Sequence, residues 1–245
     1  MAEHKTNSDA YDSYADVYAQ SIEHKPYNAH YDRPAVQSLL PNIEGLQMLD
    51  AGCGPGIYTD WLLQQGAAVT GIDGSARLID IARTRVGDAA MFHVADLSQP
   101  LDFLATGSFD LILSALTIHY IQDIESLFAE FARVLKPGGC FVFSTHHPFY
   151  DYQRDPNKYF LTELLTETWH FGGQPVEVRF YHRPLGAITG ALSRSGFVIE
   201  RLIEPLPSPE FKQADPEAYE RLMLRPNFMA VRARATMLTD TNTGE

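Results

Sequence analysis

A short apolar strand that runs directly into a glycine-rich turn is the feature that most constrains this chain. Leu46–Asp50 is the predicted strand, and Gly52-Cys53-Gly54-Pro55-Gly56 follows it. Glycine lets the backbone approach a ligand closely, and the first N–H groups of the helix that follows are free to bind it. Asp73 ends the next predicted strand, about twenty residues on, where a carboxylate can bind ribose hydroxyls. The pattern predicts a nucleotide-type site at the edge of a parallel sheet.

The residues around this loop, from 46 to about 144, alternate short apolar runs with amphipathic stretches. Such alternation is typical of βαβ units on a parallel sheet. Phe109–Ser114 is rich in apolar residues, as suits a strand buried on both faces. The other predicted strands are Ala67–Asp73, Ala90–Val94 and Cys140–Thr145, and the predicted helices are Ile57–Gln65, Ser75–Arg85 and Ile124–Leu135. The last of these helices ends at Lys136-Pro137-Gly138-Gly139.

Beyond the fifth strand the pattern changes to one rich in aromatic residues and prolines. Glu167–Phe171 and Val176–His182 are predicted to form a hairpin around Gly172-Gly173-Gln174-Pro175. Leu185–Ser195 has helical spacing, and Phe197–Leu202 and Phe228–Ala235 are predicted to close the sheet. We therefore expect five segments along the chain: an N-terminal lid (1–38), the core (39–145), a cap insertion (146–184), the rest of the core (185–236) and a tail (237–245).

The glycine loop can be tested against the dinucleotide-binding fingerprint G-x-G-x-x-G. With Gly52 and Gly54 as its first two glycines, that fingerprint requires a third at position 57, which is Ile57. The third glycine instead comes one residue earlier, at Gly56. The resulting order from Asp50, D-x-G-x-G-x-G, resembles the first motif of the class I S-adenosylmethionine-dependent methyltransferases.

Further segments resemble that family in the same order. Asp73 matches its ribose-binding acid, Ala95-Asp96-Leu97 the segment that contacts the adenine amino group, and Arg133–Gly139 the turn into the fifth strand. The resemblance is strong over residues 46–145. It implies an α/β fold with a Rossmann-like, doubly wound, seven-stranded and mostly parallel sheet, an N-terminal helical lid and a cap inserted after the fifth strand. It also implies that S-adenosyl-L-methionine is the cofactor.

The loop and the resemblance together define a set of expected cofactor-binding residues. Asp50 either contacts the cofactor or holds the loop in place, and Cys53 is expected to be a small filler rather than a nucleophile. Lid tyrosines either cover the sulfonium, whose charge an aromatic face attracts, or only pack on the core. The complete set is Tyr14, Tyr18, Tyr31, Asp50, Ala51, Gly52, Cys53, Gly54, Gly56, Asp73, Gly74, Ala95, Asp96, Leu97, Ser114 and His119.

Three histidines are the candidate catalytic residues. His146 and His147 follow the fifth strand at the ligand-binding edge of the sheet, and His119 lies beyond the fourth. A histidine there can act as a general base near neutral pH, although only one of the adjacent pair need face the pocket. The alternatives are a hydrogen-bonded turn for the pair and structural packing for His119. Four aromatic residues of the cap either line a substrate cavity or pack the hairpin: Trp169, Phe171, Phe180 and Tyr181.

Composition bears on the partner and the compartment. The chain carries 19 basic and 31 acidic residues, a formal net charge of −12, so we expect it to bind neither nucleic acid nor membrane. Cys53 and Cys140 lack metal-ligand spacing, and no acidic-histidine cluster suggests a metal. The absence of a signal peptide or a long apolar run favours the cytoplasm.

The predicted function is metal-independent methyl transfer, by in-line displacement, to an oxygen, nitrogen or carbon atom of a small-molecule acceptor. The protein is expected to be a monomer or a homodimer. The alternative is a regulatory protein that binds S-adenosylmethionine or S-adenosylhomocysteine without methylating any acceptor.

Overall fold

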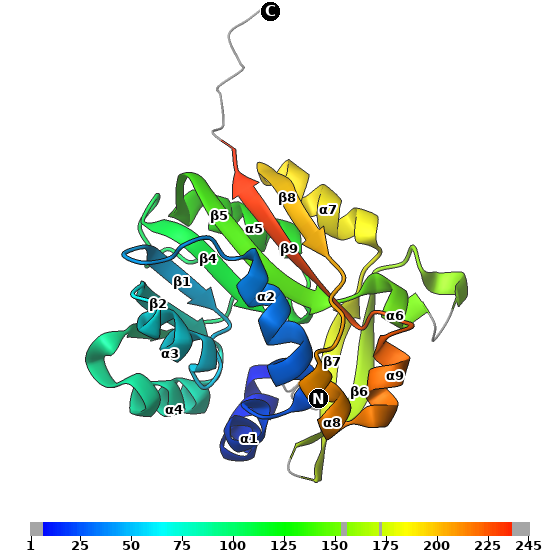
Figure 1. Ribbon diagram of the computed structural model, residues 1–245. Coiled ribbons are helices and arrows are strands. Elements are labelled where there is room, and N and C mark those ends of the chain that lie inside the picture. Colours follow the sequence, from blue (N-terminus) through cyan, green and yellow to red (C-terminus); the bar gives the residue numbers. More distant parts are fainter. Residues whose placement is uncertain (1–6, 153–155, 172, 237–245) are drawn as a thin grey trace, which may run out of the picture.

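A seven-stranded sheet lies at the centre of the computed structural model, which describes residues 7–152, 156–171 and 173–236 (Figure 1). The strand order is β3-β2-β1-β4-β5-β9-β8. The first five strands in this order are parallel, and β9 is antiparallel to both of its neighbours. This confirms the predicted fold class. The strands are β1 (Gln47–Ala51), β2 (Ala68–Asp73), β3 (Met91–Val94), β4 (Phe109–Ala115), β5 (Leu135–His146), β8 (Phe197–Ile203) and β9 (Phe228–Ala235).

Helices cover both faces of the sheet, and a separate two-stranded hairpin, β6 (Glu163–Phe171) and β7 (Gln174–His182), follows β5. The longer helices are α1 (Asn7–Ile22), α3 (Ile57–Gln64), α4 (Ala76–Val86), α5 (Ile124–Val134) and α7 (Leu185–Arg194). The shorter ones are α2 (Arg33–Leu39), α6 (Pro148–Tyr152), α8 (Pro209–Ala214) and α9 (Pro216–Leu222). Single helical turns are η1 (Asn28–Asp32), η2 (Gly87–Ala89), η3 (Ile118–Tyr120) and η4 (Pro156–Lys158).

Several details of the fold differ from the sequence prediction. In the hairpin, β6 begins at Glu163 rather than Glu167, and Gln174 and Pro175, predicted to lie in the turn, belong to β7. Strand β5 begins at Leu135, directly after α5, and not at Cys140. Its pairing with β4 shifts between Leu135 and Cys140, so the predicted Lys136–Gly139 turn is an irregularity within the strand. The Lys136 ammonium lies 2.7 Å from a carboxylate oxygen of Asp110 on β4, and this ion pair keeps the irregular part of β5 against β4. Helices α8 and α9 were not predicted, although Ser208-Pro209 and Asp215-Pro216 are helix-starting pairs.

The core consists of two apolar layers, one on each face of the sheet. On one face, α5 and α7 pack on β5, where Phe141 makes ring contacts with Phe128, Phe131, Phe143 and Phe197. On the other face, α2 and α3 cover the sheet. Burial on both faces explains why the central strands are so rich in apolar residues.

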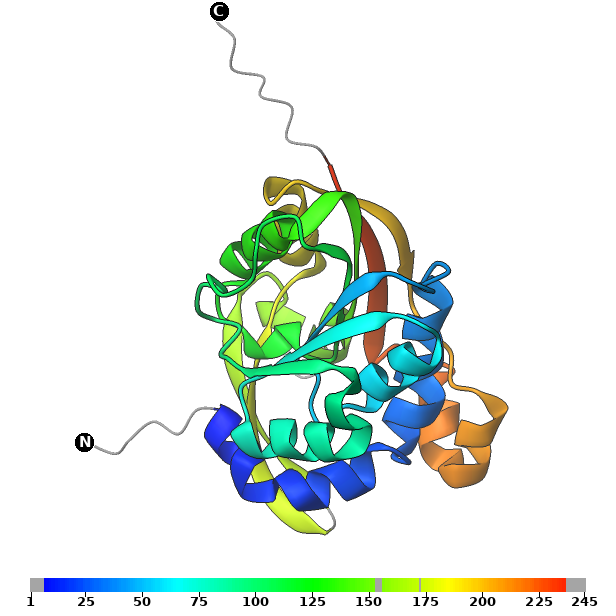
Figure 2. The same cartoon turned by 90° about the vertical axis from the view of Figure 1, so that its left-hand side faces the viewer.

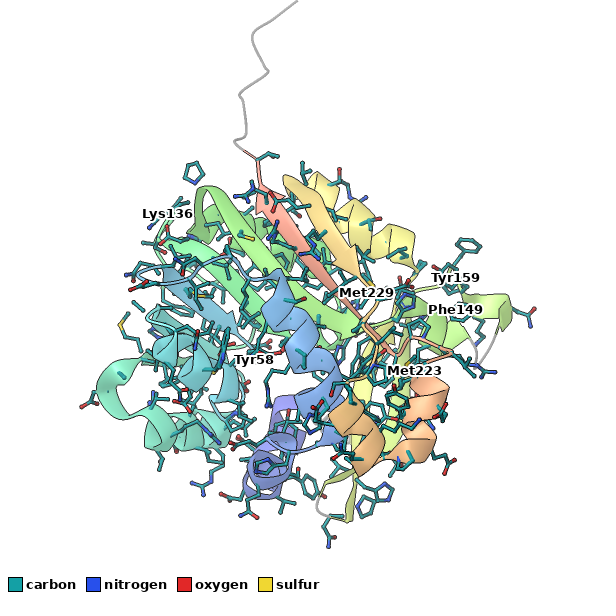
Figure 3. The ribbon with its side chains drawn as sticks, viewed as in Figure 1. Tyr58, Lys136, Phe149, Tyr159, Met223 and Met229 are labelled. Carbon is teal, nitrogen blue, oxygen red and sulfur yellow. The ribbon has the colours of Figure 1, made fainter. Side chains whose placement is uncertain are left out.

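Helix α1, the β6–β7 hairpin and helices α8 and α9 gather at the end of the sheet where the parallel strands finish (Figures 1 and 2). Figure 3 marks the two ends: Lys136 lies at the start of β5, and Met223, just after α9, lies towards the opposite end. Helix α1 lies along α4, where Asp16 forms an ion pair with Arg77 at 2.6 Å. The carboxylate of Asp12 also accepts hydrogen bonds from the Ser75 hydroxyl and from the Arg77 N–H, the latter at 3.1 Å.

The side of α1 facing the hairpin is apolar. Tyr14, Val17 and Tyr18 pack there against the buried Val178 and Phe180 of β7. Helix α1 therefore joins the sheet region to the hairpin. Among the described residues, no helix is long and apolar enough to cross a membrane.

We expect Phe141→Ala to lower the free energy of unfolding by about 3–5 kcal/mol, because the substitution leaves a cavity among fully buried rings. Urea denaturation measures this change. Phe160→Ala is the matched control: its ring is 86% exposed, so the same truncation should cost less than about 0.5 kcal/mol. Equal losses for the two variants would contradict the assignment of the core.

Candidate active site

Two cavities meet at the carboxyl end of the parallel strands. The smaller, about 110 Å³, is bordered by the glycine loop and by the segment between α1 and α2. The larger, about 460 Å³, is bordered by α1, the hairpin and the start of β9. The residues that line both, and so mark the boundary between them, are Tyr18, Ile22, Asn28, Leu116 and Tyr120.

Gly52 and Gly54 of the loop are explained by different features of the structure. Gly52, at φ +80°, lies so close to the loop after β4 that an added Cβ would come within 2.2 Å of the Thr117 hydroxyl oxygen. Gly54, at φ +53°, lines the smaller cavity, and an added Cβ there would meet no atom within 4 Å. Gly52 is therefore explained by protein packing, whereas Gly54 borders open space that a ligand can fill.

Polar groups behind the loop hold it to the sheet. A carboxylate oxygen of the buried Asp50 accepts the Thr59 hydroxyl at 2.6 Å, and burial raises the pKa of Asp50 to about 7. The Ser114 hydroxyl donates to the carbonyl oxygen of Ala51 at 2.9 Å. Asp50, Ala51 and Ser114 line neither cavity. Of the two roles considered for Asp50, the structure favours holding the local fold, and the partner is helix α3 rather than the loop amides.

Asp73, at the end of β2, bonds to the same loop. Its carboxylate accepts the Gly54 N–H and the Ser75 N–H, each at 2.9 Å, and burial raises its pKa. Asp96 is exposed and accepts the Ser98 N–H at 2.8 Å. Asp73 and Asp96 line neither cavity, and the same holds for the residues around them that were also expected at the cofactor: Gly56, Gly74, Ala95 and Leu97.

Cys53 lines the smaller cavity, and burial raises the pKa of its thiol well above the ordinary value. The thiol is therefore protonated near neutral pH and is a poor nucleophile, which agrees with its expected role as a filler.

The lid tyrosines are divided among three places. Tyr18 lines both cavities, whereas Tyr14 packs on the hairpin. Tyr31 is buried away from both cavities: its hydroxyl accepts the Asn227 N–H at 3.1 Å, and its ring stacks on Phe228. Tyr58 of α3, which was not among the expected residues, lines the smaller cavity.

Asp32 and Arg33 also line the smaller cavity, although the sequence analysis did not predict them as site residues. Asp32 is 3% exposed, and burial raises its pKa to about 6. One of its oxygens lies 3.3 Å from the Tyr58 hydroxyl, and the other has no hydrogen-bond partner among the described residues. The Arg33 Nε is likewise buried without a partner in this part of the chain. A single Asp-Arg pair before Pro34 carries no recognisable motif, so only the fold reveals it.

His119 and His146 stack in the wall of the larger cavity, with ring centroids 4.0 Å apart and an interplanar angle of 15°. Burial is the main cause that lowers the pKa of His119 well below its ordinary value, and the neighbouring His146 and Arg183 lower this pKa further. The His119 ring is therefore neutral. His147 lines neither cavity. Its Nε2 lies 2.9 Å from a Glu204 carboxylate oxygen, and its Nδ1 accepts the Phe149 N–H.

The rest of the larger cavity combines aromatic rings with charged groups. Trp169 of the cap lines it, but Phe180 is buried beside it in the hairpin cluster, and Tyr181 lies under the Arg183 guanidinium. The Phe171 side chain lies outside the described residues. The described residues contain no group of three or more metal-ligating side chains. Tyr27, one of the tyrosines of the expected lid, lines this cavity as well. The wall residues not foreseen from the sequence are Lys25, Tyr150, Glu167, His170, Arg221, Asn227 and Phe228.

Comparison with known proteins agrees with this geometry. Residues 49–143 match a family model described as a methyltransferase domain. A crystal structure of an S-adenosylmethionine-dependent methyltransferase from Mesorhizobium loti is 32% identical, covers 87% of this chain and 99% of its own, and has a TM-score of 0.68. An uncharacterized protein of Haemophilus influenzae is 26% identical over 91% of this chain and 94% of its own.

A ubiquinone biosynthesis O-methyltransferase from Paramagnetospirillum magneticum is 31% identical, but the match covers only 49% of this chain and 47% of that enzyme. The likeness to this relative is thus confined to about half of each protein. The Mesorhizobium match, by contrast, extends over nearly the whole of the solved chain. The chain therefore belongs to the S-adenosylmethionine-dependent methyltransferases, enzymes that use S-adenosylmethionine as their cofactor.

Proposed function

We propose that this enzyme methylates a small-molecule acceptor that binds in the larger cavity. The observation that carries the proposal is the adjacency of two cavities that share five lining residues. The larger one, about 460 Å³, has a size typical of small-ligand sites. The net charge of −12 disfavours nucleic acid as the acceptor.

The smaller cavity is the proposed site of the cofactor's amino-acid portion. That portion carries an ammonium and a carboxylate, which suit the buried carboxylate of Asp32 and the guanidinium of Arg33. The open space at Gly54 is a second observation that fits a ligand there. When bound, S-adenosylmethionine supplies a methyl group activated by its sulfonium. Asp73 and Asp96 remain our proposed contacts to the ribose and the adenine.

The protein's contribution to the reaction is mainly to position the acceptor. Tyr18 and Tyr120 lie at the boundary of the two cavities, where they can orient an acceptor and exclude water. Such alignment is worth up to about 7–11 kcal/mol of the barrier. Helix α1 supplies Tyr18 and also contacts α4, so we propose that residues 1–38 act as a lid over the site and that 146–184 form the cap.

His146 is the proposed general base for an acceptor that must lose a proton. It lines the larger cavity and stacks between His119 and Phe228. Because His119 is neutral, a proton taken up by His146 meets no charge on the ring stacked against it. His147 is engaged elsewhere by Glu204 and Phe149, so we do not propose it as a catalytic residue.

The choice of acceptor class can be tested with methyl-labelled cofactor. We expect label to enter members of a panel of small oxygen, nitrogen and carbon acceptors, and not tRNA or protein from an extract. Transfer to tRNA or protein alone would overturn the small-molecule assignment.

Gly54→Ala tests the cofactor site. The added methyl occupies space proposed for the ligand, so we expect the affinity for S-adenosylhomocysteine, measured by calorimetry, to fall about tenfold or more, which is about 1.4 kcal/mol. Gly107→Ala is the control: this glycine also has a positive φ, +64°, with no atom within 4 Å, but it lies before β4 and lines neither cavity. Similar affinities in the two variants would argue against the site.

His146→Ala tests the base. With an acceptor whose group is protonated near neutral pH, we expect kcat to fall by about 10²–10⁴ and the acidic limb of the pH profile to disappear. His147→Ala should instead lower stability, because the Glu204 and Phe149 partners are lost. If kcat falls in the His147 variant and not in the His146 variant, the assignment is reversed.

A further inference from the structure

Two basic side chains lie in the wall of the larger cavity but not in that of the smaller one. Lys25 comes from the segment that follows α1, and Arg221 from the last turn of α9. Figure 1 shows α8 near the lower end of α2 with α9 beyond it, and Arg221 donates a hydrogen bond to Tyr27, two residues after Lys25, so these distant segments meet at one side of the site. The boundary residues, such as Leu116 and Tyr120, define the side where the cofactor cavity begins. Lys25 and Arg221 therefore lie in the cavity proposed for the acceptor and not in the one proposed for the cofactor.

The Lys25 ammonium lies over the face of an aromatic ring. Its Nζ lies 5.9 Å from the centroid of the Trp169 ring, and burial lowers its pKa. A cation that has lost part of its hydration gains more from a nearby anion than one in open solvent. The Lys25 side chain is therefore a favourable place for a negatively charged ligand group.

Arg221 is tied to the same wall through Tyr27, whose hydroxyl accepts a hydrogen bond from its guanidinium. Among the described residues, no carboxylate forms an ion pair with Arg221. The guanidinium carries five N–H donors, a geometry that matches a carboxylate. The bond to Tyr27 leaves donors for a ligand.

Among the described residues of the wall, the side chains of Lys25 and Arg221 outnumber the carboxylates. Of the described lining residues, Glu167 is the only carboxylate, and one of its oxygens already accepts the Trp169 indole N–H at 2.6 Å. Lys25 and Arg221 thus outnumber it, within a protein whose overall charge is −12. A local excess of positive charge on an acidic protein points to a specific anionic ligand rather than to general attraction of anions.

The remaining wall is made largely of rings, including Tyr27, Tyr150, Trp169 and Phe228. We infer that the acceptor is an aromatic carboxylic acid, with its ring against these side chains and its carboxylate bound by Lys25 and Arg221. This inference rests on the proposed function, because it names the acceptor class of the same site.

Matched pairs of acceptors test the inference. The probes are 4-hydroxybenzoate, 4-hydroxyphenylacetate and indole-3-acetate, each compared with its neutral carboxamide. Methyl transfer gives kcat/KM, and calorimetry on the S-adenosylhomocysteine complex gives binding without turnover. We expect the acids to bind and react about tenfold to a hundredfold better than the amides, as a charge-assisted hydrogen bond allows.

Variants then assign the preference to residues. Lys25→Met and Arg221→Met should each raise KM for the acids by about tenfold and leave the amides unchanged. Lys212→Met is the matched control, because its ammonium pairs with Glu220 and lines neither cavity. Unchanged binding of S-adenosylhomocysteine in all three variants shows that they fold. If Lys25→Met does not bind S-adenosylhomocysteine, the inference is tested with Arg221→Met alone.

The outcomes separate the two levels of the proposal. Equal or better binding and turnover of the amides would overturn the anionic acceptor and leave small-molecule methylation intact. Retention of the acid preference in both cavity variants would overturn the roles of Lys25 and Arg221. Transfer to tRNA or protein alone, with both probe series neither bound nor methylated, would overturn the small-molecule function and the acceptor class together.

Discussion

The turn after β1 is the constraint on which the rest of the site depends. Gly52 must be a glycine because Thr117, beyond β4, lies against its Cα, and the Gly52 N–H bonds to Ile72 of β2 at 2.7 Å. Two residues on, the Gly54 N–H bonds to Asp73. The ends of three adjacent strands are thus fixed to one another through a single loop. The open space beside Gly54 exists because these neighbours hold the loop away from it.

Helix α1 determines how this prepared edge becomes a two-cavity site. One side of the helix is attached to α4 by polar contacts of Asp12 and Asp16, and the other packs on the hairpin through Tyr14 and Tyr18. Exposed ion pairs such as Asp16–Arg77 contribute little to stability, whereas the apolar contacts with β7 contribute more. The helix is therefore held both by α4 and by the hairpin, so the wall that separates the cavities depends on the cap as well as on the sheet region.

Local sequence patterns were sufficient to predict the sheet region. The strands from β1 to β4 match the predicted bounds within one residue, because each has a short run of apolar residues, and an aspartate and a glycine mark the ends of β1 and β2. Of the expected site residues, Gly52, Cys53 and Gly54 line the smaller cavity and His119 lines the larger one, whereas Gly56 lines neither. These features follow from contacts between residues close in the chain or from a motif of fixed spacing.

The N-terminal segment and the wall of the larger cavity were harder to predict because they depend on contacts between distant segments. Tyr31 was expected near the cofactor, but it packs against Phe211 and Phe228, which come from the far end of the chain. Asp32 and Arg33 reach the smaller cavity only because that packing orients the segment before α2. No periodicity or motif within residues 27–33 encodes such a contact, so this part of the site became visible only in three dimensions.

The position of β9 has a consequence for how the molecule is assembled. A chain extended as far as His146 already contains the five parallel strands and the glycine loop. Strand β8 comes later, yet it joins the sheet only through β9, the last strand, which inserts between β5 and β8. Asn227 and Phe228, which lead into β9, also complete the wall of the larger cavity. The order of synthesis therefore separates the two cavities in time: the glycine loop that borders the smaller cavity can form early, and the wall of the larger cavity is completed with β9.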